Sequence, residues 1–338
     1  MRASGNVWAV VLAAGDGTRL ESLTTNDRGD VVPKQFCSLR GGQSLLGEAL
    51  RRCEAVASSH HICVVVASRH RRWWRPLLAE VPTANVIVQP LNRGTANGIL
   101  LPLLHIMARD PDARIALLPS DHYVRDEQVL AAALQAAVQS LESKVDEITL
   151  LGIHPQNADS DLGYIVPGSA DESGISRVER FVEKPDKSLA RELIEAGALW
   201  NAFILTGHVR TFRDLFMMRH SAIVASMQSA IARDTNRGGD ARAIAAVYRQ
   251  LPLIDFSRHV LPGANGLLRV MKVDRCGWSD IGTPARLLET LQGLPRDTRT
   301  ESVNPDIAPL NLSMQLEEKR TRLDHDGNAR IGLGDSSH

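Results

Sequence analysis

The sequence predicts an α/β fold in which a mostly parallel central sheet carries helices on both faces. From residue 7 to residue 153, short apolar runs rich in Val, Ile and Leu alternate with longer stretches of helical spacing. Such alternation is typical of a parallel sheet whose strands are buried on both sides. Polar segments follow several of these runs directly, and ligands of such sheets bind at the carboxyl ends of the strands. We therefore expect a functional site at that edge.

The first half of the chain should supply the regular part of this sheet. An apolar run at 7–12 predicts the first strand, and residues 44–57 place their apolar side chains on one face of a helix. The segments that follow are a strand at 61–67, a helix at 69–80, a strand at 85–89, a helix at 95–109, a strand at 114–118, a helix at 126–142 and a strand at 148–153.

The pattern changes from residue 163 onward. Two strands are expected at 162–166 and 175–182, joined by the polar stretch 167–174. After them we expect a helix at 188–196, helical stretches over 208–250, a strand at 267–273 and a helix at 284–291. Residues 1–293 would form one catalytic domain, and 294–338 a linker and a partly disordered tail, since prolines and polar residues dominate there.

Composition excludes several classes of partner. Lys and Arg number 39, as do Asp and Glu, so no net charge attracts nucleic acid or an anionic membrane. The four cysteines show no paired spacing, which argues against a zinc site or a disulfide framework. No apolar run reaches membrane-spanning length, and the first strand begins too early for a signal peptide. We expect a cytoplasmic protein that acts on small molecules, and a homodimer is left open.

The first strand runs into a glycine-rich loop, LAAGDGTRL, at 12–20. Bare backbone N–H groups in such a loop cradle phosphate, and Arg19 and Lys34 would add two cations. The loop is neither a Walker motif nor the dinucleotide fingerprint, and a glycine-rich turn after one strand is more often only a turn. With its cations, however, the segment indicates a triphosphate site.

The strings LAAGDGTRL and PKQF (33–36) resemble the signature of nucleotidyltransferases that join a nucleoside triphosphate to a sugar 1-phosphate. PKQF is the form found in mannose-1-phosphate guanylyltransferases, although the spacing from Arg19 to Pro33 is a few residues longer than usual. The resemblance covers residues 7–291 and implies a Rossmann-like, GT-A-like fold of the nucleotide-diphospho-sugar transferase type.

The segment QPLNRGTA at 89–96 is also a turn followed by a capped helix. It resembles the family pattern QPxNRGTA, which lines the purine pocket and favours guanine. The resemblance implies nucleotide contacts from Leu12, Ala13, Ala14, Gly15, Gly17, Thr18, Arg19, Gln89, Asn92, Arg93, Gly94, Thr95 and Ser120.

Two further segments resemble the sugar-phosphate site of the family. Glu183 and Lys184 lie in FVEKP, where the glutamate bonds sugar hydroxyls and the lysine holds the sugar phosphate. Asn201 lies in WNAF, where the family has WNSG, so Ala202-Phe203 departs from the pattern. Together with Gly163, these residues would bind the sugar 1-phosphate.

The resemblance also implies a magnesium ion between Asp121, in PSDH, and Asp280, in GWSDIGT. Mg²⁺ is bound through one or two carboxylates, substrate phosphates and water, which fits two isolated aspartates. The catalytic residues would be Arg19, Lys34, Asp121 and Lys184.

The reaction implied is an in-line attack of a sugar 1-phosphate, most simply α-D-mannose 1-phosphate, on the α-phosphate of GTP, giving GDP-mannose and pyrophosphate. Another base or sugar, such as thymidylyl or uridylyl transfer to glucose 1-phosphate, stays open. So does a catalytically silent protein that binds sugar nucleotides to regulate a partner. The cytidylyltransferases of isoprenoid synthesis share the opening motif, but they lack QPxNRGTA and FVEKPD.

Overall fold

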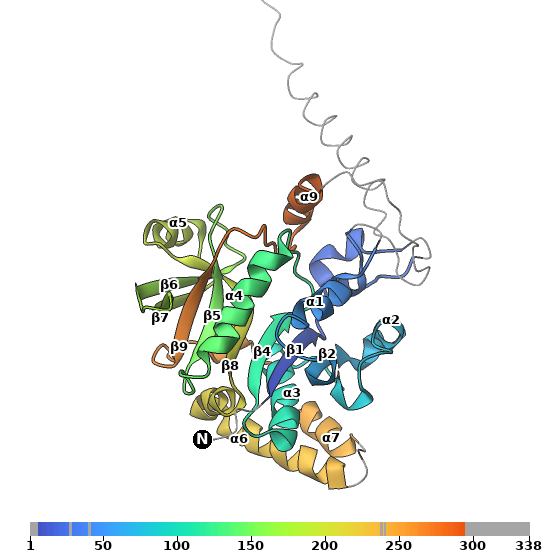
Figure 1. Ribbon diagram of the computed structural model, residues 1–338. Coiled ribbons are helices and arrows are strands. Elements are labelled where there is room, and N and C mark those ends of the chain that lie inside the picture. Colours follow the sequence, from blue (N-terminus) through green and yellow to red (C-terminus); the bar gives the residue numbers. More distant parts are fainter. Residues whose placement is uncertain (1–5, 27–28, 40–41, 237–238, 240, 295–338) are drawn as a thin grey trace, which may run out of the picture.

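The computed structural model describes residues 6–26, 29–39, 42–236, 239 and 241–294, which form one nine-stranded sheet with helices on both faces (Figure 1). The strands are β1 (Val7–Ala13), β2 (Ile62–Ala67), β3 (Val86–Gln89), β4 (Arg114–Pro119), β5 (Ile148–Ile153), β6 (Gly163–Ala170), β7 (Ile175–Glu183), β8 (Leu199–His208) and β9 (Leu268–Val273). Their order in the sheet is β3-β2-β1-β4-β8-β5-β9-β7-β6. The predicted α/β class is confirmed.

The sheet has a parallel half and a mixed half. Strands β3, β2, β1 and β4 are all parallel to one another, as expected, and so is the pair β5–β9. Every pairing of β6, β7 and β8 is antiparallel. Because β6 pairs with β8 as well as with β7, the strands β8, β5, β9, β7 and β6 close into a ring of pairings. The parallel arrangement inferred from strand–helix alternation therefore ends where β6 and β7 form a hairpin.

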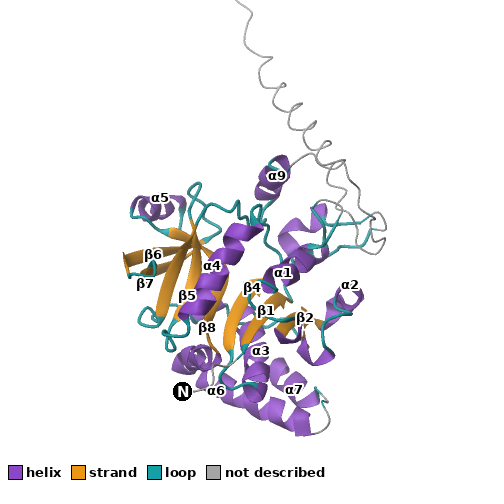
Figure 2. Ribbon diagram, in the orientation of Figure 1, coloured by secondary structure: helices purple, strands orange, loops and turns teal. Residues whose placement is uncertain are grey.

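The helices are α1 (Leu45–Cys53), α2 (Arg71–Leu77), α3 (Thr95–Arg109), α4 (Glu127–Ser140), α5 (Lys187–Glu195), α6 (Val209–Asn236), α7 (Arg242–Gln250), α8 (Phe256–His259) and α9 (Pro284–Gln292) (Figure 2). Short 3-10 turns also occur, including Lys34–Phe36. Side-chain oxygens accept backbone N–H bonds at several of the helix starts, among them those of Ser44, Asp126, Asp186 and Thr283. Such caps satisfy donors that would otherwise lack partners.

Two apolar layers cover the sheet, one on each face. In β1, Trp8 and Val10 face a cluster built with α3, α6 and α7, whereas Ala9 and Val11 face a cluster built with α1, α2, α4 and α5. This strict alternation follows from the period of two along a strand. Because the two faces of the sheet are covered, the loops at the carboxyl ends of β1 and β4 lie at the edge that stays open.

Most of the expected elements are present, but the sequence predicted no strand at β8, which lies between β4 and β5 in the sheet. A few boundaries also differ. The connection between β6 and β7 is shorter than the expected stretch 167–174, because β6 continues to Ala170. The Asp171 carboxylate closes the turn by accepting hydrogen bonds from the N–H groups of Ser173 and Ile175. The helical stretch 208–250 consists of α6 and α7. The expected linker and tail lie outside the described residues, apart from residue 294. Among the described residues, no helix is both long and apolar enough to span a bilayer.

Candidate active site

A large cavity lies where the strands of the parallel half end. This main cavity has a volume of about 560 Å³. Its lining comes from the loop after β1, the end of β3 and start of α3, the end of β4, the residue after β7 and the middle of β8. The predicted site residues among them are Leu12, Ala14, Gly15, Gly17, Gln89, Asn92, Gly94, Thr95, Ser120, Asp121 and Lys184. Segments far apart in the sequence thus meet at one edge of the sheet.

A second hollow, of about 240 Å³, adjoins the main cavity and shares Gly17, Asp121 and His122 with it. We call it the carboxylate hollow because it is also lined by Asp280. Three further residues that the sequence predicted for the site, Thr18, Arg19 and Lys34, also line this hollow. All four predicted catalytic residues therefore line one or the other of two adjoining hollows.

The loop after β1 is held by side chains from elsewhere. Gln35 Nε2 donates to the carbonyls of Ala13 at 3.1 Å and Gly15 at 2.9 Å, and Ser120 Oγ donates to the carbonyl of Leu12 at 2.7 Å. The Ala13 side chain is fully buried, and the carbonyl of this residue takes part in holding the loop. The N–H groups of Gly15, Asp16 and Gly17 donate no hydrogen bond within the described part of the chain. They are free to bind an anion, as the sequence predicted.

The start of α3 is fixed by a close backbone approach. Gly94 has φ +86°, and a Cβ there would lie 2.2 Å from the carbonyl oxygen of Ile254. The N–H of Ala96 donates to that carbonyl at 3.0 Å, and Thr95 Oγ1 accepts from the N–H of Phe256 at 2.8 Å. Only glycine fits this turn.

Two amides in the same segment tie it to its surroundings. Gln89 Nε2 donates to the hydroxyl of Tyr248 at 3.1 Å, which fixes the amide at the wall of the main cavity. Asn92 Oδ1 accepts from the N–H of Gly94, and its Nδ2 donates to the Asp16 carboxylate at 3.0 Å. Asn92 thereby joins the segment at 89–95 to the loop after β1.

Arg93 does not lie in the cavity. Its Nε donates to the carbonyl of Tyr248 at 2.9 Å and its Nη2 to that of Arg249 at 3.0 Å, at the carboxyl end of α7. Cations are favoured there because the last carbonyls of a helix have no partner within it. The guanidinium thus holds α7 beside the site, and the direct nucleotide contact expected from the sequence stays a prediction.

The two predicted cations differ. Lys34 is buried, and its Nζ lies 2.9 Å from Asp121 Oδ2 while donating to the carbonyls of Asp280 at 2.6 Å and Ile281 at 3.3 Å. It is therefore a fixed charge. The Arg19 side chain is exposed and makes no ion pair or hydrogen bond with any described residue. It is the cation available to a ligand in this hollow.

Asp121 remains ionised beside Lys34. Burial is the largest single influence and acts to raise the pKa of this carboxyl, but Lys34, through its charge and its hydrogen bond, and His122 together hold the pKa below its usual value. Burial also lowers the pKa of His122 to about 4, so its imidazole is neutral at pH 7. Its ring meets that of Trp278 edge-on at 5.2 Å.

Asp280 is placed by a backbone bridge between Tyr123 and Ser279. Its Oδ1 lies 3.0 Å from Arg286 Nε but has no hydrogen bond within the described chain, although it is buried. The described residues contain no group of three or more side chains of the kind that encloses a metal. Two carboxylates on one hollow, one with an unsatisfied oxygen, nevertheless fit Mg²⁺, which takes its other ligands from phosphates and water.

The predicted sugar-site residues also meet. Gly163 and Glu183 are partners in the β6–β7 ladder, and a Cβ on Gly163 would lie 2.7 Å from Glu183 Oε2 and 3.5 Å from Asn201 Cβ. Lys184, next in sequence, has φ +52° and turns into the main cavity. Burial raises the pKa of Glu183, with Lys184 opposing.

Phe203 was noted in the sequence only as a departure from a family pattern, and it lines the main cavity. It stands at an irregularity of β8, between the pairs Leu150–Leu205 and Gly152–Asn201. Its φ is +56°, a conformation that costs a bulky residue energy. Asn201 Oδ1 accepts from its N–H at 3.0 Å, and its ring packs on Phe256. The glycine expected at this position was the signal that could have identified it.

Comparison with known proteins shows what the chain is similar to. The sequence matches the family described as Nucleotidyl transferase over residues 8–296. It is 28% identical to the xanthan biosynthesis protein XanB of Xanthomonas campestris pv. campestris (strain B100) over 84% of this chain and 59% of that protein. It is 27% identical to mannose-1-phosphate guanylyltransferase 2 of Escherichia coli O157:H7, over 81% of this chain and 58% of that protein. The chain thus spans less than two thirds of the length of these curated relatives.

Solved structures of other proteins resemble this fold. A Thermus thermophilus protein named mannose-1-phosphate geranyltransferase superposes with a TM-score of 0.72 at 28% identity, over 86% of this chain and 81% of that one. A UDP-glucose pyrophosphorylase bound to UDP-glucose superposes with a TM-score of 0.56 over 85% of this chain and 97% of that one, at 14% identity, which shows a shared fold alone.

Proposed function

Because the chain belongs to the nucleotidyl transferase family, we propose that it joins GTP to α-D-mannose 1-phosphate, forming GDP-mannose and pyrophosphate. The observation that carries the proposal is the main cavity itself. It brings the free N–H groups of the loop after β1 into one space with Gln89, Asp121 and Lys184. A phosphate cradle, a fixed amide, a carboxylate and a lysine are what a triphosphate and a second phosphate require.

The guanine preference is supported by the segment at 89–95. Gln89 presents an amide group at the cavity, held by Tyr248, while Asn92 ties the segment to Asp16. An amide offers both a donor and an acceptor, which the edge of guanine complements. The E. coli relative named for guanylyl transfer to mannose 1-phosphate supports the same choice.

In the proposed reaction, a phosphate oxygen of the sugar 1-phosphate forms a bond to the α-phosphorus of GTP. The bond from that phosphorus to the oxygen bridging the β-phosphate breaks, and pyrophosphate leaves with its electron pair. The attacking phosphate is already an anion at neutral pH, so no general base is needed. The chain's contribution is position and charge.

Each charged residue has a separate part in this scheme. Lys184 aims the incoming phosphate from the sugar side of the main cavity, and Arg19 neutralises the departing pyrophosphate from the carboxylate hollow. Lys34 keeps Asp121 ionised and ties it to the backbone at 280–281. Asp121 and Asp280 would hold Mg²⁺, which when bound supplies positive charge to the phosphates.

Pyrophosphate release tests the proposal. GTP, ATP, CTP, UTP and dTTP would each be offered with mannose 1-phosphate and with glucose 1-phosphate in the presence of Mg²⁺. We expect turnover with GTP and mannose 1-phosphate to exceed every other pair by at least about tenfold. A preference for another base or for glucose 1-phosphate would contradict the specificity, and no turnover with any pair would contradict the activity.

A further inference from the structure

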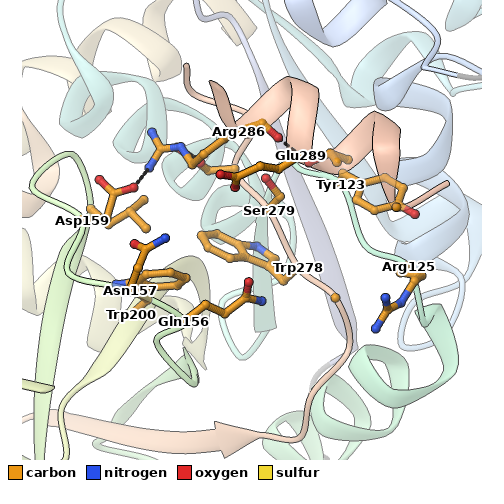
Figure 3. A pocket seen from close by; sticks show the side chains of 15 residues that line it. Tyr123, Arg125, Gln156, Asn157, Asp159, Trp200, Trp278, Ser279, Arg286 and Glu289 are labelled. Carbon is orange, nitrogen blue, oxygen red and sulfur yellow. Dashed lines mark hydrogen bonds and ion pairs between the residues drawn. The ribbon is translucent and has the colours of Figure 1, made fainter. Parts of the chain in front are cut away.

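Asp280 borders a third hollow, of about 160 Å³, as well as the carboxylate hollow. Figure 3 shows this third hollow, with Asp159 and Arg286 meeting at one side of it and the indoles of Trp200 and Trp278 below. Arg286 comes from the first turn of α9, and Asp159 from the connection between β5 and β6. The arginine lies within reach of both Asp159 and Asp280, so one cation serves two carboxylates.

The two contacts of Arg286 are unequal. Its Nη1 donates an aligned hydrogen bond to Asp159 Oδ2 at 2.6 Å. Its Nε lies 3.0 Å from Asp280 Oδ1, but neither atom completes a hydrogen bond within the described chain. The side chains are only 13% (Arg286), 18% (Asp159) and 16% (Asp280) exposed, so water does little to screen these charges. Asp280 therefore feels the arginine as a charge while one of its oxygens stays unsatisfied.

Asp159 is held firmly enough to keep the arginine. Its backbone N–H and carbonyl both bond the hydroxyl of the fully buried Tyr164, at 2.9 Å each. Its second oxygen accepts from the N–H of Asp161 at 2.8 Å. The carboxylate is thus fixed in position before it meets Arg286.

Asp280 has little freedom of its own. A Cβ on Gly282 would lie 2.4 Å from Asp280 Oδ2 and 2.8 Å from Arg286 Nη2, so only glycine allows the two side chains to pack over it. On the other side, Lys34 fixes the carbonyls of Asp280 and Ile281. What can still change around Asp280 is how closely Arg286 pairs with it, because the arginine also pairs with Asp159.

We propose that Arg286 is a positioning residue whose charge competes with a divalent cation for Asp280, and that Asp159 limits this competition by holding the arginine. The inference rests on the proposed function, since that is what assigns Asp280 to the metal. It makes opposite predictions for the two partners. Removing Arg286 should strengthen cation binding, and removing the charge of Asp159 should weaken it, because the arginine would then pair with Asp280 alone.

The test is the dissociation constant of Mn²⁺, measured by electron paramagnetic resonance on the full chain with an α,β-methylene analogue of GTP. We expect Arg286→Gln to lower this constant about fivefold and Asp159→Asn to raise it about fivefold. In an Arg286→Gln background, Asp159→Asn should lose most of its effect, as a double-mutant cycle would show.

Glu289→Gln is the matched control. Glu289 lines the same hollow on the same helix as Arg286, and no ion pair joins them in the described chain. Its change in charge equals that of Asp159→Asn, yet we expect the constant to move by less than about twofold. An equal effect of Glu289→Gln would mean that the field of the whole hollow acts rather than the shared arginine, and would overturn the proposal.

Other outcomes are equally decisive. If Arg286→Gln does not fold, as judged by its thermal melting, Asp159→Asn and Glu289→Gln still separate the two explanations. Unchanged Mn²⁺ binding in Asp159→Asn, or no Mn²⁺ binding by the wild type, would overturn the inference whatever the turnover. A wild type that binds Mn²⁺ with the expected shifts but releases no pyrophosphate would contradict the proposed function alone.

Discussion

The proposed nucleotide side of the site (residues 12–19 and 89–95) and its proposed sugar side (163, 183–184 and 201–203) make their turns by different means. On the nucleotide side, left-handed backbone falls on glycines, Gly17 at φ +66° and Gly94 at φ +86°. On the sugar side it falls on Lys184 at +52° and Phe203 at +56°. A side chain in this region costs about 1 kcal/mol or more. The sugar side therefore tolerates strain at the positions where a side chain faces the cavity.

The largest effect should come from breaking a glycine on the nucleotide side. In Gly94→Ala the new Cβ would overlap the carbonyl of Ile254, besides adopting an unfavourable φ. We expect the free energy of unfolding to fall by about 4 kcal/mol, measured in urea. Gly174→Ala is the control, since its φ of +74° is similar but nothing lies within 4 Å of the new Cβ. That change should cost only about 1 kcal/mol, and equal losses in the two variants would contradict the steric account.

Removing Lys34 should lower turnover by about 10²–10³-fold, as loss of one charge-stabilising donor typically does. Lys34→Met keeps the length of the side chain but leaves Asp121 without its cation. Steady-state turnover measures the loss. Near-wild-type activity would remove Lys34 from the mechanism.

The same variant should reverse a pH effect on stability. In the wild type, the pKa of Asp121 lies below the ordinary 3.8, so its contribution to stability is present above that value and is lost as the pH falls through the lowered pKa. In Lys34→Met, burial raises the pKa of Asp121 with only the weaker influence of His122 against it, and the Asp121 contribution should then grow as the pH falls toward about 4. Urea unfolding from about pH 3 to pH 7 checks this sign. Identical pH profiles of the two proteins would contradict it.

On the sugar side, Phe203→Gly should separate the two substrates. Loss of the ring removes an apolar wall of the cavity, and we expect the KM for mannose 1-phosphate to rise about tenfold, as for the loss of one good apolar contact. The KM for GTP should change less than about twofold. A larger change for GTP than for the sugar phosphate would show that Phe203 belongs to the nucleotide side.

The smallest functional effect should come from Arg93, which holds the end of α7 rather than the cavity. In Arg93→Ala we expect the free energy of unfolding to fall by about 1–2 kcal/mol, from two lost hydrogen bonds to a charged donor. The KM for GTP should stay within about twofold. A tenfold rise without loss of stability would restore the direct nucleotide contact predicted from the sequence.

Sequence reasoning reached what depends on local pattern. Apolar periodicity placed the strands of the parallel half, and the rule that ligands bind at their carboxyl ends brought the loop after β1, Gln89 and Asp121 together. The family resemblance also grouped Gly163, Glu183 and Asn201, which meet in the structure. These residues lie at strand ends or opposite one another in a ladder, where position along the strand largely determines position in space.

The features that could not be predicted from the sequence depend on partners far apart in the chain. Nothing near Arg286 in the sequence signals that its guanidinium bonds Asp159, which lies 127 residues away. Nothing near Lys34 signals that the carbonyls at 280–281 would fix its ammonium. Arg93 was assigned by motif, whereas its direction is decided by the unpaired carbonyls at the end of α7. The ring of pairings formed by β8, β5, β9, β7 and β6, antiparallel except for the pair β5–β9, likewise depends on which distant strands pair and not on periodicity.

Separate titrations of a guanine nucleotide and of the sugar phosphate test the proposed division of the cavity most directly. GDP and mannose 1-phosphate would be titrated calorimetrically into Lys184→Met, the latter with the α,β-methylene analogue of GTP present, and Lys187→Met on the exposed start of α5 would serve as the control. We predict that Lys184→Met weakens mannose 1-phosphate binding at least about tenfold, leaves GDP within about twofold, and that the control changes neither. Equal weakening of both ligands, or of neither, would contradict a cavity with distinct nucleotide and sugar sides.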